Sequence, residues 1–374
     1  MKMKYFILCL FLFGSAVLAQ EMSLDEKVGQ LLLVHFSGDK VNQEAEQLIE
    51  ELHVGGFIYY ELANALTSPD QVKKLSHQLQ MKNKESHEIP LFIAIDQEGG
   101  RVTHLKEGFT LLPSAREVGS LHTLEKASRL AYQVGGEFRA VGVNMNLAPV
   151  IDVDTNPSCP LMGSRRYASD PKMVAAFGRA TLEGYKESGI IAVAKHFPGY
   201  GGALCDPHLG LPTLIKSKGE LERCDLEPFR VVAPLSPAIM TAHLFAPALD
   251  PLNIATFSAT IVQGLLREVL GFQGVIMTDS LLMEGALQDF SIEEAAIRAF
   301  LAGHDILIIA GRLENDRASW STLPLLKRVH GALSQAVMDG RITRERLNAS
   351  VRRILTLKQS ITPLDRLSKV QGER

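Results

Sequence analysis

Cysteine is scarce in this chain. Four cysteines occur in 374 residues, and one of them, Cys9, lies in an N-terminal apolar segment. The other three are Cys159, Cys205 and Cys224, and an odd number leaves at least one thiol outside any disulfide within the chain. A Cys159–Cys205 disulfide is conceivable if their loops meet, but we expect three ordinary thiols. Because 46% of the residues are hydrophobic, a chain of this length can bury a large core. The composition therefore excludes a small scaffold held together by disulfides.

Neither sign of charge is in excess. Lysine and arginine total 39, and aspartate and glutamate total 42, which gives a formal net charge of −3. The chain has no basic stripe and no run of like charges, whereas nucleic-acid-binding surfaces are usually basic. We therefore expect no nucleic-acid partner.

Long apolar runs are absent after the N-terminus. The first residues combine cationic "MKMK" with apolar "YFILCLFLFGSAVLA", which ends in small residues at Val17 and Ala19. This pattern predicts a secretory signal peptide over residues 1–19 and an exported protein, periplasmic or secreted. The run is short for a membrane span, so an uncleaved anchor is the less favoured alternative. Cys9 lies inside the run rather than at its end, which does not favour lipoprotein processing.

After this segment, short apolar runs alternate with amphipathic helical patterns. The runs are almost continuously apolar, which is typical of parallel strands covered on both faces. There are eight of them: "VGQLLLVHF", "VGGFIYYE", "PLFIAIDQEGGR", "VNMNLAPVIDVD", "GIIAVAKHFPG", "PAIMTAHLF", "GVIMTDS" and "HDILIIAGR". Eight β–α units in about 330 residues indicate a single-domain α/β fold, a (β/α)8 TIM-like barrel over residues 20–360 with a polar tail over 361–374. A doubly wound open sheet is the alternative, although eight units would be many for one.

Polar side chains stand at the ends of several predicted strands. Barrel enzymes carry their chemistry at the carboxyl ends of the strands, so these side chains would meet in one pocket. Taken singly, each has a simpler interpretation; Asp279, for example, could cap a helix. The candidates are Asp96 and Arg101 in the third unit, Asp152 and Asp154 in the fourth, Lys195 and His196 in the fifth, His243 in the sixth and Asp279 in the seventh.

A glycine-containing loop after the fifth run carries a second histidine. Asp206 and Pro207 resemble a helix start, but Gly210 and Pro212 follow too closely for a helix to continue. In an extended segment, residues two apart point the same way, so Asp206 could orient His208 and stabilise its charged form. An imidazole can both give and take a proton near neutral pH.

The order of the motifs carries a specific resemblance. "AIDQEGGRV", "APVIDVDTNP", "KHFPGYG", "DPHLGLP", "IMTAHLF", "ATFSATIVQGLLREVLG" and "GFQGVIMTDSLLMEGA" occur in this order. Together they resemble the single-domain bacterial β-N-acetylglucosaminidases of glycoside hydrolase family 3, over essentially the whole chain after the signal peptide. The resemblance implies a TIM-like barrel that removes a terminal β-linked N-acetylglucosamine with retention of configuration. It implies a glycan partner, no metal and no cofactor.

The resemblance also implies roles for individual residues. Asp279 matches the nucleophile that forms a glycosyl-enzyme, and His208 with Asp206 matches the acid/base. Predicted contacts to the sugar are Asp96, Arg101, His104, Arg165, Lys195, His196, His243 and Met283.

Four positions depart from the family pattern. Tyr200 stands where a histidine is usual in "KHFPGHG", and His104 stands where an arginine is expected. Ser280 follows the nucleophile in place of an aspartate, and Pro207 replaces a small hydroxyl residue. None of them removes the nucleophile or the acid/base; the change at His104 concerns the outer sugar contacts.

Three alternatives to hydrolysis by this route stay open. A phosphorylase of the same family would use phosphate in place of water. A metal-dependent barrel hydrolase would use the metal-capable residues of one loop, His196, Cys205, Asp206 and His208. A barrel that binds glycans without turnover is the third.

Overall fold

The computed structural model describes residues 21–156, 162–203, 210–287, 290–313, 316–320 and 322–361. The predicted signal peptide, both cysteines of the conceivable disulfide, and residues 362–374 of the predicted tail lie outside these ranges. Within the described ranges, no helix is both long enough and apolar enough to cross a membrane.

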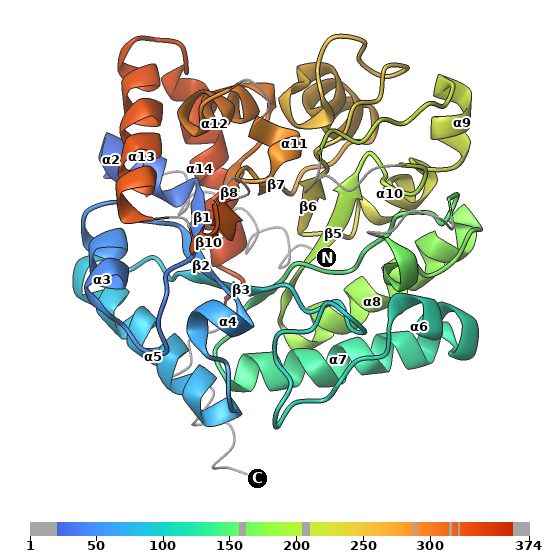
Figure 1. Cartoon of the computed structure of the whole chain (residues 1–374), viewed down its shortest axis with the longest axis horizontal. Helices are drawn as coiled ribbons and strands as arrows, with labels where there is room; N and C mark the ends of the chain where they lie inside the picture. Colours follow the sequence, from blue (N-terminus) through green and yellow to red (C-terminus); the bar gives the residue numbers. More distant parts are fainter. Residues whose placement is uncertain are drawn as a thin grey trace, which may run out of the picture.

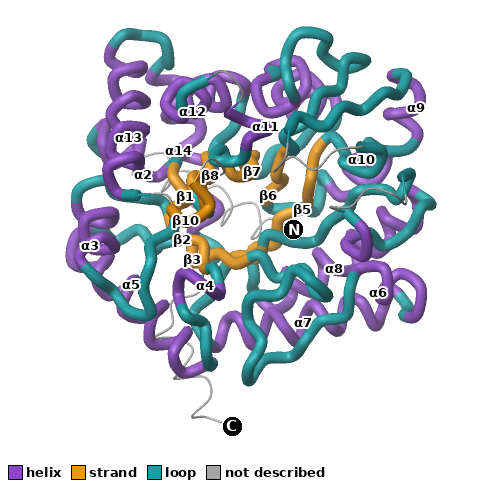
Figure 2. The backbone as a smooth tube through the Cα atoms, viewed as in Figure 1, coloured by secondary structure: helices purple, strands orange, loops and turns teal. Residues whose placement is uncertain are grey.

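Eight parallel strands close into a barrel (Figures 1 and 2). Every strand pairs with its neighbour in sequence, and β1 pairs with β8 to complete the ring. Each predicted apolar run contains one strand, so the predicted barrel is confirmed and the open sheet is excluded. The strands are β1 (Leu32–Val34), β2 (Gly56–Tyr59), β3 (Phe92–Ile95), β4 (Met145–Asn146), β5 (Ile191–Phe197), β6 (Ala238–Thr241), β7 (Val275–Ser280) and β8 (Ile306–Ile309).

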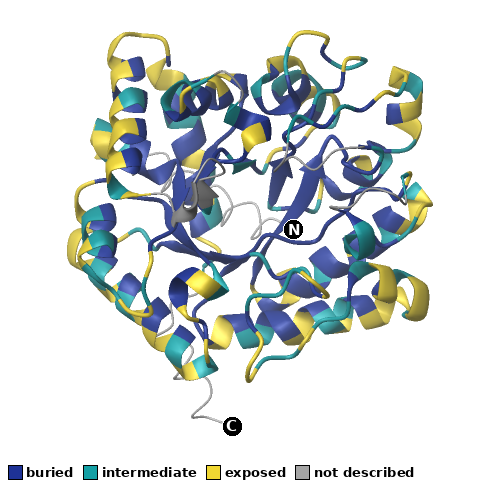
Figure 3. Cartoon of the chain, viewed as in Figure 1, coloured by how far each residue is buried: buried dark blue, intermediate teal, exposed yellow. Residues whose placement is uncertain are grey.

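Helices surround the barrel and bury its outer face (Figure 3). Several of them begin at a capping side chain: α8, for example, starts at the Asp170 cap with Pro171 in its first turn and stops at Gly189 in the left-handed conformation. The helices are α2 (Leu24–Gln30), α3 (Gln43–Glu50), α4 (Glu61–Asn64), α5 (Pro69–Ser86), α6 (Ala115–Leu121), α7 (Leu124–Ala140), α8 (Pro171–Ser188), α9 (Lys218–Arg223), α10 (Glu227–Val232), α11 (Glu284–Leu287), α12 (Ile292–Ala302), α13 (Leu323–Met338) and α14 (Arg344–Lys358).

Three further helical segments and a hairpin complete the described chain. The segments are the 3₁₀ turns η1 (Gly163–Arg165) and η2 (Ala255–Phe257) and the π-helix η3 (Thr260–Val269); β9 (Arg312–Leu313) and β10 (Asp316–Trp320) pair antiparallel after β8.

The strands carry apolar side chains on both faces. β5 and β8 are buried along their whole length, and so is β3. Outside, α7 and α8 lie close together because Gly184 has no side chain: a Cβ there would come within 2.1 Å of the Ser128 carbonyl oxygen. This packing leaves polar side chains at the carboxyl ends of the strands, where the candidate site is built.

Candidate active site

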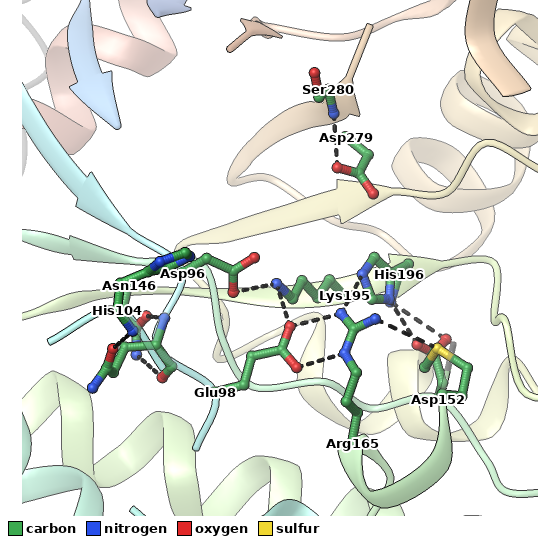
Figure 4. A network of polar contacts seen from close by, with 12 residues as sticks. Asp96, Glu98, His104, Asn146, Asp152, Arg165, Lys195, His196, Asp279 and Ser280 are labelled. Atoms are coloured by element: carbon green, nitrogen blue, oxygen red, sulfur yellow. Dashed lines mark hydrogen bonds and ion pairs between the residues drawn. The ribbon is translucent and has the colours of Figure 1, made fainter. Parts of the chain in front are cut away.

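Five strand ends bring the predicted polar residues to one end of the barrel. In Figure 4, Asp279 on β7 lies across from a row formed by Asp96, Lys195 and His196, with Arg165 below them. The grouping expected from the strand ends is therefore present in the structure.

Asp279 lies near the end of β7, and its carboxylate has a local hydrogen bond. The Ser280 backbone N–H donates to Asp279 Oδ1 at 2.7 Å. Burial alone would raise the pKa of this carboxyl, but the nearby His243, His196 and Lys195 and the Ser280 amide bring the net pKa below its ordinary value. Asp279 is therefore ionised at neutral pH, as a carboxylate nucleophile must be.

His243 supports the strand that carries Asp279. Its Nε2 lies 2.9 Å from the Ser280 carbonyl oxygen, which can only accept, so this nitrogen holds a proton and donates. Its Nδ1 lies 2.7 Å from Thr256 Oγ1, and the ring is fully buried. Both ring nitrogens thus have protein partners, and the geometry favours a supporting role beneath Asp279. The predicted sugar contact of His243 stays a prediction.

Lys195 connects two carboxylates. Its Nζ donates to Asp96 Oδ1 at 2.8 Å and lies 2.7 Å from Glu98 Oε1. Glu98 in turn accepts two hydrogen bonds from Arg165, from Nε to Oε2 and from Nη2 to Oε1, both at 2.7 Å (Figure 4). Glu98 was not among the predicted site residues, although it follows Asp96 by two positions in "AIDQEGG".

Burial and the neighbouring charges move these groups in different directions. Burial raises the pKa of Asp96, and the charge of Glu98 adds to the effect, so the net pKa is raised despite Lys195 and Arg165. Burial also acts to raise the pKa of Glu98, but Arg165 and Lys195 outweigh it and hold that pKa far below its usual range. Burial acts to lower the pKa of Lys195, but the charges of Asp96 and Glu98 outweigh it. The net pKa is therefore raised, and Lys195 stays charged.

The loop that carries Glu98 is held by the end of β4. Asn146 accepts the backbone N–H of Gln97 at 3.0 Å and donates to the Gln97 carbonyl oxygen at 3.0 Å. The Gln97 side chain accepts the backbone N–H groups of His104 at 2.7 Å and Leu105 at 3.0 Å. These bonds fix the chain on both sides of the carboxylate.

His196 is oriented by a buried aspartate. Its Nδ1 lies 2.7 Å from Asp152 Oδ2, and the carboxylate also accepts the backbone N–H of Tyr200 at 2.6 Å. A proton on Nδ1 leaves Nε2 as the acceptor, and Arg165 Nη2 lies 3.4 Å from it. Asp152 therefore sets which nitrogen of His196 is open to a donor.

Two of the departures from the family pattern have structural roles. The Tyr200 hydroxyl donates to the His243 carbonyl oxygen at 2.7 Å. The Tyr200 ring packs edge to face against the His196 ring, with the two ring centroids 5.5 Å apart. Ser280 Oγ donates to the Ala310 carbonyl oxygen at 2.7 Å, which ties β7 to the chain after β8.

Aromatic rings form a further part of the site. Tyr60 follows β2 directly. Its ring packs edge to face against the rings of His104 and His35, with ring centroids 5.6 Å and 5.8 Å apart. Burial raises the pKa of Tyr60, and the charges of Asp96 and Asp279 add to this rise. Tyr60 was not predicted as a site residue; the polar aromatic at a strand end, "FIYYE", was its signal.

The remaining predicted residues differ in their placement. His104 is partly buried, burial lowers its pKa, and its Nδ1 accepts the Glu61 backbone N–H at 3.4 Å. Met283 is buried after β7, and Arg101 is exposed. Asp206 and His208 lie outside the described residues.

A metal centre finds no support in the described part of the chain. No group of three or more histidine, cysteine, aspartate or glutamate side chains is placed there to hold an ion. His196 is engaged by Asp152, and Cys205, Asp206 and His208 lie outside the described residues.

The family model described as "Glycosyl hydrolase family 3 N terminal domain" matches residues 23–357. The chain belongs to glycosyl hydrolase family 3. It is 33% identical over 336 residues to "Beta-hexosaminidase A" of Pseudoalteromonas piscicida, with 85% of this chain and 55% of that protein covered. It is 35% identical over 292 residues to "Beta-hexosaminidase" of Pseudomonas aeruginosa (strain PAO1), with 77% of this chain and 83% of that protein covered.

A solved structure extends the comparison. The family 3 β-N-acetylglucosaminidase of Paenibacillus sp. FPU-7 superposes with a TM-score of 0.85 at 40% identity, over 91% of this chain and 62% of that one. This chain therefore spans less than two thirds of the Pseudoalteromonas and Paenibacillus proteins, and more than four fifths of the Pseudomonas one. The predicted family and its barrel fold are confirmed.

Proposed function

We propose that this family 3 protein is a retaining exo-β-N-acetylglucosaminidase. It would remove terminal β-linked N-acetylglucosamine from peptidoglycan fragments or chitin-type oligosaccharides. The observation that carries the proposal is an ionised Asp279 facing the cluster of Asp96, Glu98, Arg165 and Lys195 at the carboxyl end of the barrel. Relatives named β-hexosaminidase and β-N-acetylglucosaminidase support the choice of sugar.

The reaction follows from two groups with different tasks. Asp279 attacks the anomeric carbon and forms a glycosyl-enzyme ester while the bond from that carbon to the leaving oxygen breaks. In the proposal, His208, oriented by Asp206, gives its proton to the leaving oxygen. It then takes a proton from water, whose oxygen attacks the anomeric carbon and releases Asp279 as a carboxylate.

The polar cluster would bind the sugar hydroxyl groups and the N-acetyl group. The side chain of Asp96 is 26% exposed and can accept hydrogen bonds, whereas Lys195 and Arg165 can only donate. A buried donor that finds no acceptor on the ligand costs free energy, so such a set discriminates between sugars. This scheme uses neither a metal nor a cofactor.

The decisive experiment compares Asp279→Asn with wild type on 4-nitrophenyl β-N-acetylglucosaminide. Loss of the attacking carboxylate should reduce kcat by at least about a thousandfold, since the covalent step is removed. Asp170→Asn is the matched control, because Asp170 is exposed and caps α8 by accepting the Lys172 backbone N–H, a role that asparagine fills equally well. Equal rates for wild type and Asp279→Asn, or no activity in either, would overturn the assignment.

The same assay separates the alternatives. With phosphate present, a hydrolase releases free N-acetylglucosamine, whereas a phosphorylase releases the sugar 1-phosphate. Undiminished activity after treatment with a strong chelator would exclude the metal-dependent route. A barrel that only binds glycans would show affinity for N-acetylglucosamine and no turnover.

We also propose that the protein is exported through residues 1–19. The support is the cationic start, the apolar run and the small residues before Gln20. Expression in a bacterial host should yield a mature N-terminus at Gln20 in the periplasm or medium, detected by N-terminal sequencing. A product that keeps Met1 and stays in the cytoplasmic fraction would contradict export.

A further inference from the structure

Glu98 is placed where it can act on the site without touching the sugar. Its side chain is 4% exposed, and both oxygens face cations. Oε1 lies 2.7 Å from Lys195 Nζ and 2.7 Å from Arg165 Nη2, and Oε2 accepts Arg165 Nε at 2.7 Å. Since its oxygens are taken by these bonds, Glu98 has little capacity left for a ligand.

The partners of Glu98 come from different parts of the barrel. Arg165 belongs to η1 after β4, and Lys195 belongs to β5. Each also reaches a residue of the predicted sugar pocket: Lys195 donates to Asp96 at 2.8 Å, and Arg165 lies 3.4 Å from His196. One carboxylate therefore fixes two cations whose other contacts lead to the pocket.

The position of Glu98 is itself fixed. The neighbouring Gln97 is clamped by Asn146 through two hydrogen bonds of 3.0 Å. A flexible arginine or lysine side chain loses conformational freedom when it is held, and a paired, buried carboxylate at a fixed place removes that freedom before a ligand arrives. The arrangement is that of a pre-organised supporting shell around a binding site.

We propose that Glu98 is a positioning residue, which holds Arg165 and Lys195 in the orientation in which they bind the sugar. This inference rests on the proposed function, because it takes the cluster to be the sugar pocket. The competing interpretation is a structural ion pair that stabilises the fold and leaves the affinity for sugar unchanged.

Two substitutions separate the charge of Glu98 from its reach. Glu98→Gln keeps the size but removes the charge, and its amide nitrogen cannot accept from Arg165. Glu98→Asp keeps the charge but withdraws the carboxylate by one methylene, so the bonds to Arg165 cannot all form at their present lengths. Glu137→Gln is the matched control, because Glu137 is a carboxylate with bonds outside the cluster. It accepts hydrogen bonds from Thr110, from the backbone N–H at 2.8 Å and from the side-chain hydroxyl at 2.5 Å.

The measurements are steady-state kinetics on 4-nitrophenyl β-N-acetylglucosaminide, calorimetric affinity for N-acetylglucosamine, and Tm, all on the whole protein. Both Glu98 variants should lower kcat/KM and the affinity for N-acetylglucosamine by about 10- to 100-fold. Glu98→Gln should also move the acid limb of the kcat/KM profile to lower pH, because the negative charge that helps to raise the pKa of Asp96 is gone. Glu98→Asp should leave that limb in place, and Glu137→Gln should keep wild-type kinetics.

Three outcomes would overturn the inference. Wild-type kinetics and sugar affinity in Glu98→Gln, whatever its Tm, would show a structural ion pair only. Equal losses in Glu98→Gln and Glu137→Gln would show a general effect of destabilisation. A wild type that binds no N-acetylglucosamine would overturn both this inference and the proposed function. By contrast, a wild type that binds N-acetylglucosamine without turnover would overturn the proposed function alone, and the calorimetry would still test Glu98.

Discussion

At the scale of single residues, the surroundings of two aspartates separate their tasks. Burial acts to raise the pKa of Asp279, but His243, His196, Lys195 and the Ser280 backbone N–H outweigh it, so this carboxyl stays ionised into acid solution. Burial and Glu98 together raise the pKa of Asp96, although Lys195 donates to it. Groups of one chemical type that are displaced in opposite directions are a common mark of an acid/base or ligand-binding site.

This difference predicts which residue sets the acid limb of activity. As pH falls, Asp96 takes up a proton before Asp279 and can no longer accept hydrogen bonds with both oxygens. The limb of kcat/KM should therefore lie above about pH 4, the ordinary aspartate value. Profiles between pH 3 and 9 check this, and Asp96→Asn should lower the affinity for substrate while removing this limb. A limb below the ordinary value in wild type would show that Asp96 does not control it.

Whether a site residue could be predicted from the sequence depends on whether a strand or a loop places it. Asp96, Lys195, His196 and Asp279 lie on or directly after strands, and strand ends in a barrel converge whatever the loops do. Glu98 reaches the cluster through the conformation of a loop, which the Asn146 clamp decides, and that clamp joins positions 49 residues apart. Apolar patterns carry no information about such a contact, so Glu98 was not predicted.

At the scale of elements, the periodic patterns predicted the helices well. Ser291 stands directly before an amphipathic run, and it caps α12 by accepting the Glu294 backbone N–H. Ser258 accepts the Ile261 backbone N–H at 3.0 Å, but the segment that follows, η3, has π-type bonding rather than the α-helix that its pattern suggests. An apolar stripe of a few turns marks a helix facing a core and does not fix its winding.

His304 joins two of these elements and predicts a pH dependence of stability. Its Nδ1 lies 2.8 Å from the Ala299 carbonyl oxygen of α12, and its Nε2 lies 2.8 Å from Thr241 Oγ1 of β6. Burial lowers its pKa to about 3, so the folded protein holds the neutral ring. The unfolded chain binds the proton near pH 6.5, so this contribution is complete above that pH and is lost as pH falls towards 3.

Urea unfolding from pH 7 to 4 checks this element. Wild type should lose more free energy of unfolding than His304→Gln does over this interval, because the variant cannot titrate there. The variant should be less stable at pH 7, since one of two buried bonds is lost, by about 1–3 kcal/mol. Parallel pH profiles for the two proteins would show that His304 does not contribute.

At the scale of the whole molecule, closing the barrel brings the two ends of the described chain together. β1 pairs with β8, and α14 lies against α2. Lys358 of α14 reaches Gln30 of α2, where its Nζ donates to Oε1 at 2.8 Å across a separation of 328 positions. The Nζ also lies 4.9 Å from the centre of the Phe92 ring. The contact connects α14 to α2, the last and first helices of the described residues, at the amino end of the barrel.

Burying the charged form of Lys358 costs free energy of folding, and a substitution should remove this cost. Burial lowers the pKa of Lys358 to about 7, whereas a free lysine has a pKa near 10.4. The unfolded chain therefore binds more protons between these values, and wild-type stability should rise as pH increases from 7 to 10. Lys358→Met fills a similar volume without a charge, so it should flatten this rise. It should also increase the free energy of unfolding at pH 7, on the order of 2 kcal/mol after the lost Gln30 bond is counted. Urea unfolding of both proteins at pH 7, 8.5 and 10 measures the two slopes, and equal slopes would mean that Lys358 is charged in the folded barrel and that its burial costs little.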